Sequence, residues 1–319
     1  MGAYGLKTHI WNNNFKSILL LVMFPVLILA IVYAGLLLWA GYVQGGSIQY
    51  GFDYAANALP TAIPMTLAGV GVWFGVAFMG HQAMIDMATK SKSVSVSEEP
   101  RAYKLLENLC ISRGITTPRL KIIETGVMNA FASGIRDKNY TITLTRGLME
   151  SLDDEELEAV IAHELSHIKN KDVRLLIIAV IFVGIISFFG EIVVRGMFRT
   201  NLSRSTRSRR SGGDNAAVLV IIAVIIIAIA YGLAMLIRFS LSRKREYLAD
   251  AGAVELTKNP DAMIRALQKI SGHAKLDAPA EVREMAFENR SAGISGLFAT
   301  HPPIEKRIAA LVEFAGGRT

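Results

Sequence analysis

The segment AVIAHELSHIKNKD, residues 159–172, contains two histidines four residues apart, with a glutamate directly after the first. Residues four apart lie on one face of a helix, so His163 and His167 can direct a ring nitrogen at the same metal ion. Glu164 is offset by one residue, which leaves it out of the ligand set and lets it contact a water at the metal. The spacing predicts a zinc hydrolase; two surface histidines on the polar side of a helix are the alternative.

A catalytic zinc site needs a third protein ligand and one open position. Asp172 follows His167 by five residues, about 140° further round a helix, which is too far to reach the same ion. The segment REYLAD supplies Glu246 and Asp250, again four residues apart. We expect Glu246 to complete the metal site and Asp250 to accept a hydrogen bond from a ligand histidine. A surface helix with ion pairs four residues apart is the alternative.

The surrounding residues predict the helix that must hold the two histidines. Ser151 can cap its start, acidic residues crowd the first turn from 153 to 156, and apolar residues then recur at helical spacing. This helix is charged enough to lie in water, beside a membrane segment rather than inside one. Residues 240–257 read as a second helix, and Asn259 and Pro260 begin a third. A last helix is expected over residues 304–314.

Between residues 100 and 145 the pattern predicts one helix and a small sheet. The helix covers residues 100–113, with Pro100 at its first turn and Gly114 as its stop. Three short runs rich in β-branched residues follow, RLKIIET, VMNAFASGI and YTITLTRG. The single cysteine, Cys110, excludes an internal disulfide and lies on the apolar face of the predicted helix.

Apolar residues make up 52% of the 319 residues and charged residues 19%, an excess that collects in four runs. The runs cover residues 17–43, 59–80, 175–194 and 216–237. Roughly 20 apolar residues cross the hydrocarbon core of a bilayer, so we expect two hydrophobic helical hairpins. The third run is the weakest candidate, because Glu191 interrupts it.

Lysine and arginine favour the cytoplasmic side of short loops. The first 16 residues carry two lysines and no acid, and residues 44–58 carry no basic residue. Both ends of the first hairpin are therefore expected in the cytoplasm. The loop at 195–215 holds six arginines against one aspartate, so either it is translocated against the rule or residues 175–237 do not fully cross. Basic residues flank the apolar runs, which predicts membrane lipid as a partner and no nucleic acid.

Four features together resemble the HtpX-type membrane zinc metalloproteases, which are relatives of the CAAX prenyl proteases. They are HELSH with Asp172, a hydrophobic hairpin, SRKREYLADAGA and ATHPPIEKRI, and the resemblance covers nearly the whole chain. It implies an α+β integral membrane protein that is mainly helical. A zincin-like metalloprotease domain with a small β-sheet is combined with two hydrophobic helical hairpins.

We therefore expect four segments. Residues 1–80 form an N-terminal transmembrane hairpin, and residues 81–172 the first half of a cytoplasmic protease domain. Residues 173–238 form a second hydrophobic hairpin with the arginine-rich loop, and residues 239–319 complete the protease domain.

The resemblance also implies a role for each site residue. One Zn²⁺ per chain is bound by two histidines and a glutamate, a neighbouring glutamate is the general base, and an aspartate holds a ligand histidine from behind. A histidine in THPP donates to the transition-state oxyanion, an arginine holds its loop, and the NAFA segment pairs with substrate backbone as an edge strand. For NAFA a plain sheet strand is the alternative. The implied zinc ligands are His163, His167 and Glu246, the base is Glu164 and the supporting aspartate is Asp250. The oxyanion donor is His301 and the loop-holding arginine is Arg307. The NAFA segment consists of Asn129, Ala130, Phe131 and Ala132.

The implied function is a zinc-dependent endopeptidase of the cytoplasmic (inner) membrane. It cleaves membrane proteins or exposed segments at the cytoplasmic face, with damaged or misassembled membrane proteins as substrates, in quality control and stress response. A prenyl-protein (CAAX) protease shares the zinc motifs but is expected to have more membrane runs. An intramembrane protease is disfavoured by the charge of residues 152–172. A catalytically silent zinc-binding membrane scaffold is the alternative from another class; a complete base beside an open ligand position argues against it.

Overall fold

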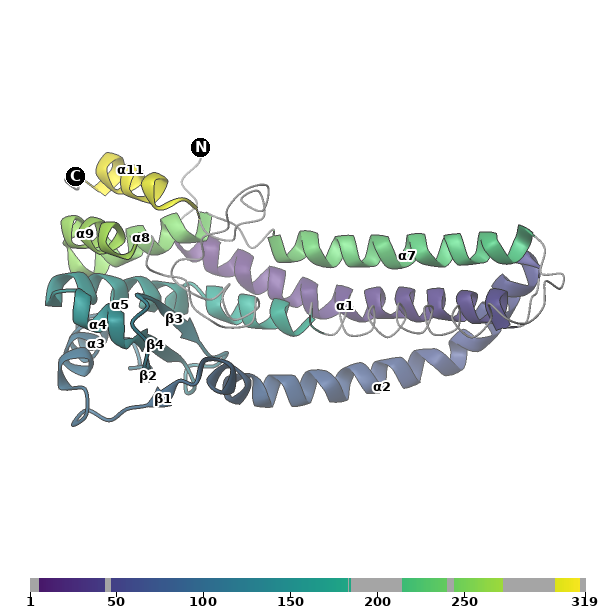
Figure 1. Ribbon diagram of the computed structural model, residues 1–319, viewed down its shortest axis with the longest axis horizontal. Coiled ribbons are helices and arrows are strands. Elements are labelled where there is room, and N and C mark those ends of the chain that lie inside the picture. The colour runs from purple at the N-terminus through teal and green to yellow at the C-terminus, as the bar shows by residue number, and fades with distance from the viewer. Residues whose placement is uncertain are drawn as a thin grey trace. The chain divides into compact units, whose positions relative to one another are not determined.

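The structure, a computed structural model, describes residues 6–43, 47–182, 184, 214–239, 244–271 and 302–315. These residues divide into two compact units. The first takes its residues from 1–16, 80–177 and 241–319, and the second from 17–79 and 178–240. The described chain is mainly helical with one small sheet (Figure 1), which confirms the predicted fold class.

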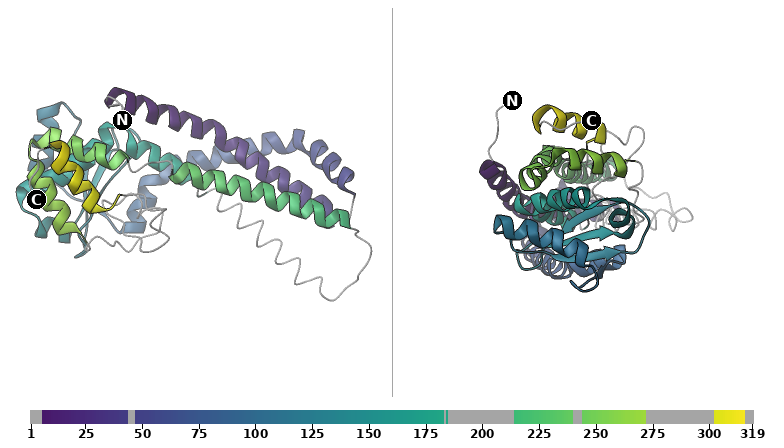
Figure 2. Two further views of the ribbon diagram at one scale, coloured as in Figure 1. Left: turned by 90° about the horizontal axis from the view of Figure 1, so that it is seen from above. Right: turned by 90° about the vertical axis from the view of Figure 1, so that its left-hand side faces the viewer.

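Three long apolar helices dominate the second unit. They are α1 (Leu6–Val43), α2 (Ile48–Thr89) and α7 (Asp214–Phe239), and they run lengthwise beside one another (Figures 1 and 2). Small and aliphatic side chains bury their contact surface, namely Ala34, Leu37, Ala55, Leu219 and Ala223. Within the part of the chain that the structure describes, two helices are long and apolar enough to cross a membrane, α1 over Leu21–Ala40 and α2.

The helices differ in length from the apolar runs. Helix α1 begins at Leu6, ahead of the run predicted from residue 17, and α2 covers 42 residues where the run covers 59–80. Helix α7 contains the whole fourth run. The third run is helical over residues 175–182, and most of its remainder lies outside the described residues.

The sheet contains β1 (Lys92–Ser93), β2 (Arg119–Ile123), β3 (Ala130–Ser133) and β4 (Thr141–Thr145). Their order is β1-β2-β4-β3, with β2 parallel to β4 and the other neighbours antiparallel. The last three strands lie in the three predicted runs. Strand β3 is at one edge, as the NAFA segment was predicted to be, and β1 is a two-residue strand that the sequence pattern did not indicate.

The two faces of the sheet differ in chemistry. Because side chains alternate along a strand, Leu120, Ile142 and Leu144 share one face, and Lys121 and Thr143 share the other. All of these side chains are buried, including the polar ones. One face is thus an ordinary apolar core, and the other is a buried polar surface that needs hydrogen-bonding partners.

The first unit also contains six shorter helices that Figure 1 labels. Helix α3 (Pro100–Arg113) starts and stops as predicted, with Gly114 left-handed at φ 62°. Helix α9 (Pro260–Ile270) has its predicted cap, since Asn259 Oδ1 accepts from the Ala262 amide at 3.0 Å. The others are α4 (Arg146–Ser151), α5 (Asp154–Lys169), α8 (Lys244–Thr257) and α11 (Ile304–Ala315).

Candidate active site

Helix α5 carries the HELSH motif, and its start is fixed by a capping box. The carboxylate of Asp153 accepts from the Glu156 amide at 2.9 Å, and the Glu156 carboxylate accepts from the Asp153 amide at 3.0 Å. The predicted cap, Ser151, is wrong because Ser151 ends α4 and the chain is extended at Leu152. Glu156 also accepts from Lys269 of α9 at 2.6 Å, so the first turn of α5 is tied to a neighbouring helix.

Helix α8 carries the REYLAD motif and packs extensively against α5. Gly252 makes this close approach possible. A Cβ at this position would lie 2.5 Å from Oγ and 2.9 Å from Cβ of Ser166 on α5. The missing side chain therefore sets the helix separation that brings Glu246 to the two histidines.

Replacement of Gly252 with alanine is expected to force the two helices apart. We expect a loss of about 1–3 kcal/mol in the free energy of unfolding, typical of overpacking, together with weaker metal binding. Unfolding curves and metal analysis of the purified variant measure both effects. Combining the change with Ser166→Gly removes the clashing atoms and should restore both; no recovery would show that the glycine is needed for another reason.

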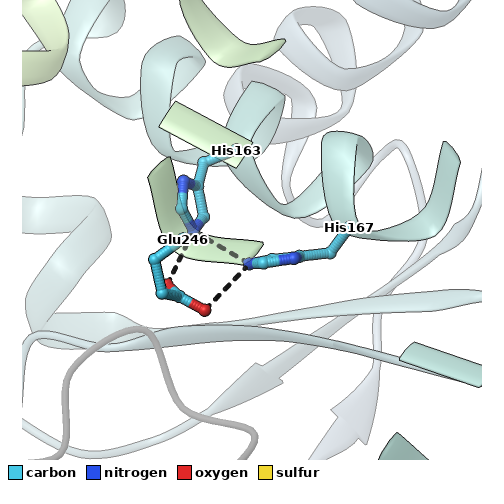
Figure 3. A group of neighbouring side chains, drawn as sticks. All are labelled: His163, His167 and Glu246. Carbon is cyan, nitrogen blue, oxygen red and sulfur yellow. Dashed lines mark hydrogen bonds and ion pairs between the residues drawn. The ribbon is translucent and has the colours of Figure 1, made fainter. Parts of the chain in front are cut away.

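The structure brings His163, His167 and Glu246 together (Figure 3). The Nε2 atoms of the two histidines lie 3.1 Å apart. Glu246 Oε2 lies 3.6 Å from Nε2 of His163, and its Oε1 lies 3.6 Å from Nε2 of His167. Three side chains from two helices therefore converge on one point, although about 80 residues separate the motifs. The alternative of two surface histidines is excluded for His163, which is fully buried.

A metal ion fits this donor set. In a tetrahedral zinc site with bonds of about 2.0–2.1 Å, neighbouring ligand atoms are roughly 3.3–3.4 Å apart. The three observed separations bracket this value. The carboxylate belongs to Glu246, whose side chain is 1% exposed, so the group is not an incidental acidic cluster on the surface.

An aspartate carboxylate contacts the Nδ1 atom of each histidine. Asp250 Oδ1 lies 2.9 Å from Nδ1 of His163, and Asp172 Oδ2 lies 3.0 Å from Nδ1 of His167. A carboxylate at Nδ1 fixes the tautomer of an imidazole and leaves Nε2 for a metal. The position of Asp250 agrees with the prediction, whereas the part played by Asp172 was missed because it was considered only as a direct ligand.

Arg307 of α11 contacts both acidic residues from α8, Asp250 and Glu246. Its guanidinium donates to both carboxylate oxygens of Asp250, at 2.9 and 2.6 Å, and its Nη1 lies 3.9 Å from Glu246. Burial alone would raise the pKa of Asp250, but the adjacent arginine charge holds it below its ordinary value. The predicted role of Arg307 was to hold the His301 loop, and His301 lies outside the described residues. The described contacts of Arg307 place it beside the metal-binding group.

The two carboxylates also act on the proton affinity of His163. Burial alone would lower the pKa of the imidazole, but hydrogen bonds with Asp250 and Glu246 raise it to about 9. Without a metal ion the ring is therefore protonated at neutral pH, and a proton and a metal ion compete for the same Nε2.

Glu164 lies on α5 next to the ligand group and is buried. Burial raises the pKa of its carboxyl, the neighbouring histidines lower it, and the backbone amide of Ala132 on β3 donates to it. A buried carboxylate with a raised pKa is a stronger base than an exposed one. The backbone contact also connects the candidate base to the edge strand.

The NAFA residues occupy that edge. The Thr145 amide donates to the Asn129 carbonyl at 3.0 Å, and hydrogen bonding alternates along an antiparallel pair. The backbone groups of Ala130 and Ala132 therefore point away from β4. The Ala130 amide is already bonded to Asn129 Oδ1 at 2.8 Å, and the residues are at most 4% exposed. A substrate strand consequently needs room beside β3 before it can pair. His301 lies outside the described residues.

Comparison with known proteins places this site in a family. Residues 97–315 match Peptidase family M48. "Protease HtpX homolog" of Bacteroides fragilis (strain YCH46) is 44% identical, covering 98% of this chain and all of that protein. "Protease HtpX homolog" of Listeria monocytogenes serotype 4a (strain HCC23) is 34% identical, covering 96% and 99%.

Among solved structures, the crystal structure of S. mikatae Ste24p is similar with a TM-score of 0.44 and 16% identity, covering 95% of this chain and 66% of that one. The family match spans most of the chain, including α5, α8 and α11, which carry the converging side chains. The chain belongs to Peptidase family M48, as an HtpX-type metallopeptidase.

Proposed function

We propose that this metallopeptidase is a zinc-dependent endopeptidase that cleaves membrane proteins or their exposed segments at the cytoplasmic face of the membrane. The observation that carries the proposal is the convergence of His163, His167 and Glu246, with Glu164 beside them. Two histidines and one glutamate are a common ligand set of catalytic zinc in peptidases. They leave one position open for water or substrate.

When bound, zinc lowers the pKa of a water to about 7 and polarises the scissile carbonyl. Within this chain Glu164 takes the proton of the attacking water and passes it to the leaving amine. Asp250 and Asp172 keep the two imidazoles in the tautomer that offers Nε2. We assign His301 the stabilisation of the oxyanion that develops on the substrate, on the strength of the family resemblance of THPP.

Substrate backbone is proposed to pair with β3. This proposal is supported by the edge position of the strand and by the outward direction of the Ala130 and Ala132 carbonyls. The hydrogen bond between the Ala132 amide and Glu164 brings the proposed base next to the paired segment. A peptide that adds to β3 therefore meets the base at the middle of the strand.

The proposed substrates follow from the apolar helices. Two helices, α1 and α2, are suited to a membrane, and the charge pattern favours a cytoplasmic location for both ends of that pair. We propose residues 1–80 and 173–238 as the membrane hairpins and residues 81–172 and 239–319 as the halves of the cytoplasmic protease domain. Membrane lipid and damaged or misassembled membrane proteins are then the partners within reach, in an inner-membrane quality-control and stress-response role.

Removal and return of the metal test this function. Casein digestion by the purified protein is expected to stop with a chelator and to recover on addition of Zn²⁺. Glu246→Ala should lower metal affinity by at least the 10–100-fold typical of losing an outer partner, because a direct ligand is lost. Elemental analysis of both proteins measures this. Full metal content without cleavage in the wild type would favour the zinc-binding scaffold instead.

A further inference from the structure

The last turns of α2 meet the polar face of the sheet through Asp86. One carboxylate oxygen forms an ion pair with Lys121 of β2. The other accepts from Gln82 Nε2 at 2.9 Å and from Ser91 Oγ at 3.0 Å. Lys121 is 7% exposed, so its charge is buried in the polar face. The ion pair with Asp86 gives this buried charge a partner of opposite sign.

Gln82 extends the network from β2 to β3, the strand at the edge of the sheet. Its Oε1 accepts from Ser133 Oγ at 2.9 Å, and Ser133 is fully buried at the end of β3. The contacts run from Lys121 through Asp86 and Gln82 to Ser133. In the sheet, β4 lies between β2 and β3, so side chains of α2 connect the two strands on either side of it.

Strand β3 depends on such a connection more than the other long strands do. It is four residues long and pairs only with β4 among the described strands. Ser133 directly follows Ala132, whose amide donates to Glu164. A shift at the end of the strand would therefore displace the backbone groups that face a substrate.

We propose that Gln82 and Asp86 are positioning residues for substrate binding at β3. They hold the Ser133 end of the strand so that its outward carbonyls stay aligned beside the base. The inference rests on the proposed function, in which β3 pairs with substrate. It predicts that the network contributes to the binding of long substrates and not to the chemical step.

Gln82→Ala tests the inference, and Gln49→Ala on the same helix is its matched control. Gln49 Nε2 likewise donates to an aspartate four residues later, Asp53, at 3.1 Å, but this pair is exposed to solvent. Two peptides cut from a mapped β-casein cleavage site serve as probes. A peptide of about ten residues covers β3 completely, whereas one of about four covers little beyond the cleaved bond, since a strand residue advances about 3.3 Å.

Gln82→Ala is expected to raise KM for the long peptide roughly three- to tenfold, the effect of one hydrogen bond, with kcat unchanged. The short peptide should be cleaved as by wild type, and Gln49→Ala should change neither. Ser133→Ala should raise KM for the long peptide similarly, and the double variant should be no worse than either single one, because both remove the same bond.

Each other outcome overturns the inference. Equal KM values for the long peptide in all variants would show that β3 does not need the network. A loss of kcat with both peptides, together with lower metal content, would show general structural support. Failure of the proposed function is recognised separately, since wild type itself would then show no zinc-dependent cleavage of casein.

Discussion

Exchange of Glu164 for glutamine is expected to reduce kcat for casein cleavage by about 10²–10⁴, the usual contribution of a general acid–base group. The metal content of the purified protein should stay that of wild type. The amide cannot take a proton from water, although it has nearly the shape of the carboxylate. Its oxygen can still accept from the Ala132 amide, so the side chain keeps its position.

The variant should fold at least as well as the wild type. Burial raises the pKa of Glu164, which means that the folded protein disfavours its charge. A neutral amide avoids this cost. Loss of activity with unchanged or increased thermal stability would therefore separate a catalytic role from a structural one.

Glu158→Gln on the same helix is the matched control, because burial also raises the pKa of Glu158. This control should keep full activity. Undiminished cleavage by Glu164→Gln would remove the base assignment, and loss of its metal would make Glu164 part of the metal-binding group.

The local elements around the site were predictable because their signals are local. Gly114 and Asn259 act within one turn of their helices, and both lie where the pattern placed them. The pairing of His163 with His167 also follows from helical spacing alone. The meeting of these residues with Glu246 depends on how two helices pack, and the family resemblance supplied that step.

Asp172 shows where a helical calculation stops being valid. The ligand group does not include it, as its angular position predicted. Helix α5, however, ends at Lys169, and Lys171 adopts a left-handed conformation at φ 60°. The chain therefore turns after the helix, and this turn places the Asp172 carboxylate beside Nδ1 of His167. The angular calculation assumed a regular helix up to Asp172, so it could not predict this contact.

Burial was the least predictable property of the site. The pattern of α5 indicated an amphipathic helix with a polar face in water, yet His163 and Glu164 are at most 2% exposed. Charged groups are buried here because each has a partner of opposite charge or a backbone donor. Such partners come from α8, α11 and β3, which are distant in the sequence.

Hydropathy likewise described only part of α2. It detects the apolar residues and so located a run over 59–80, whereas the helix continues to Thr89. The added turns carry Gln82 and Asp86, whose partners lie on the sheet. A polar extension of an apolar helix has no hydropathy signal, although in this chain its side chains form hydrogen bonds and an ion pair with the sheet.

Replacement of Arg307 with methionine is expected to lower the free energy of unfolding by about 3–5 kcal/mol, as is typical when one partner of a buried ion pair is removed. The guanidinium is 1% exposed and donates to Asp250 through two bonds. Methionine fills a similar volume but removes the guanidinium charge that faces the buried carboxylates of Asp250 and Glu246. Unfolding of the metal-depleted protein in detergent measures the loss.

An exposed arginine provides the comparison. Arg265 forms an ion pair with Glu155 at 2.9 Å, but its side chain is 43% exposed, so Arg265→Met should cost no more than about 1 kcal/mol. The double variant Arg307→Met, Asp250→Leu should regain much of the stability, because both charges of the pair are then absent. It should still bind metal about 10–100-fold more weakly, since the carboxylate beside Nδ1 of His163 is lost. Equal costs for Arg307→Met and Arg265→Met would contradict a stabilising role for the buried pair.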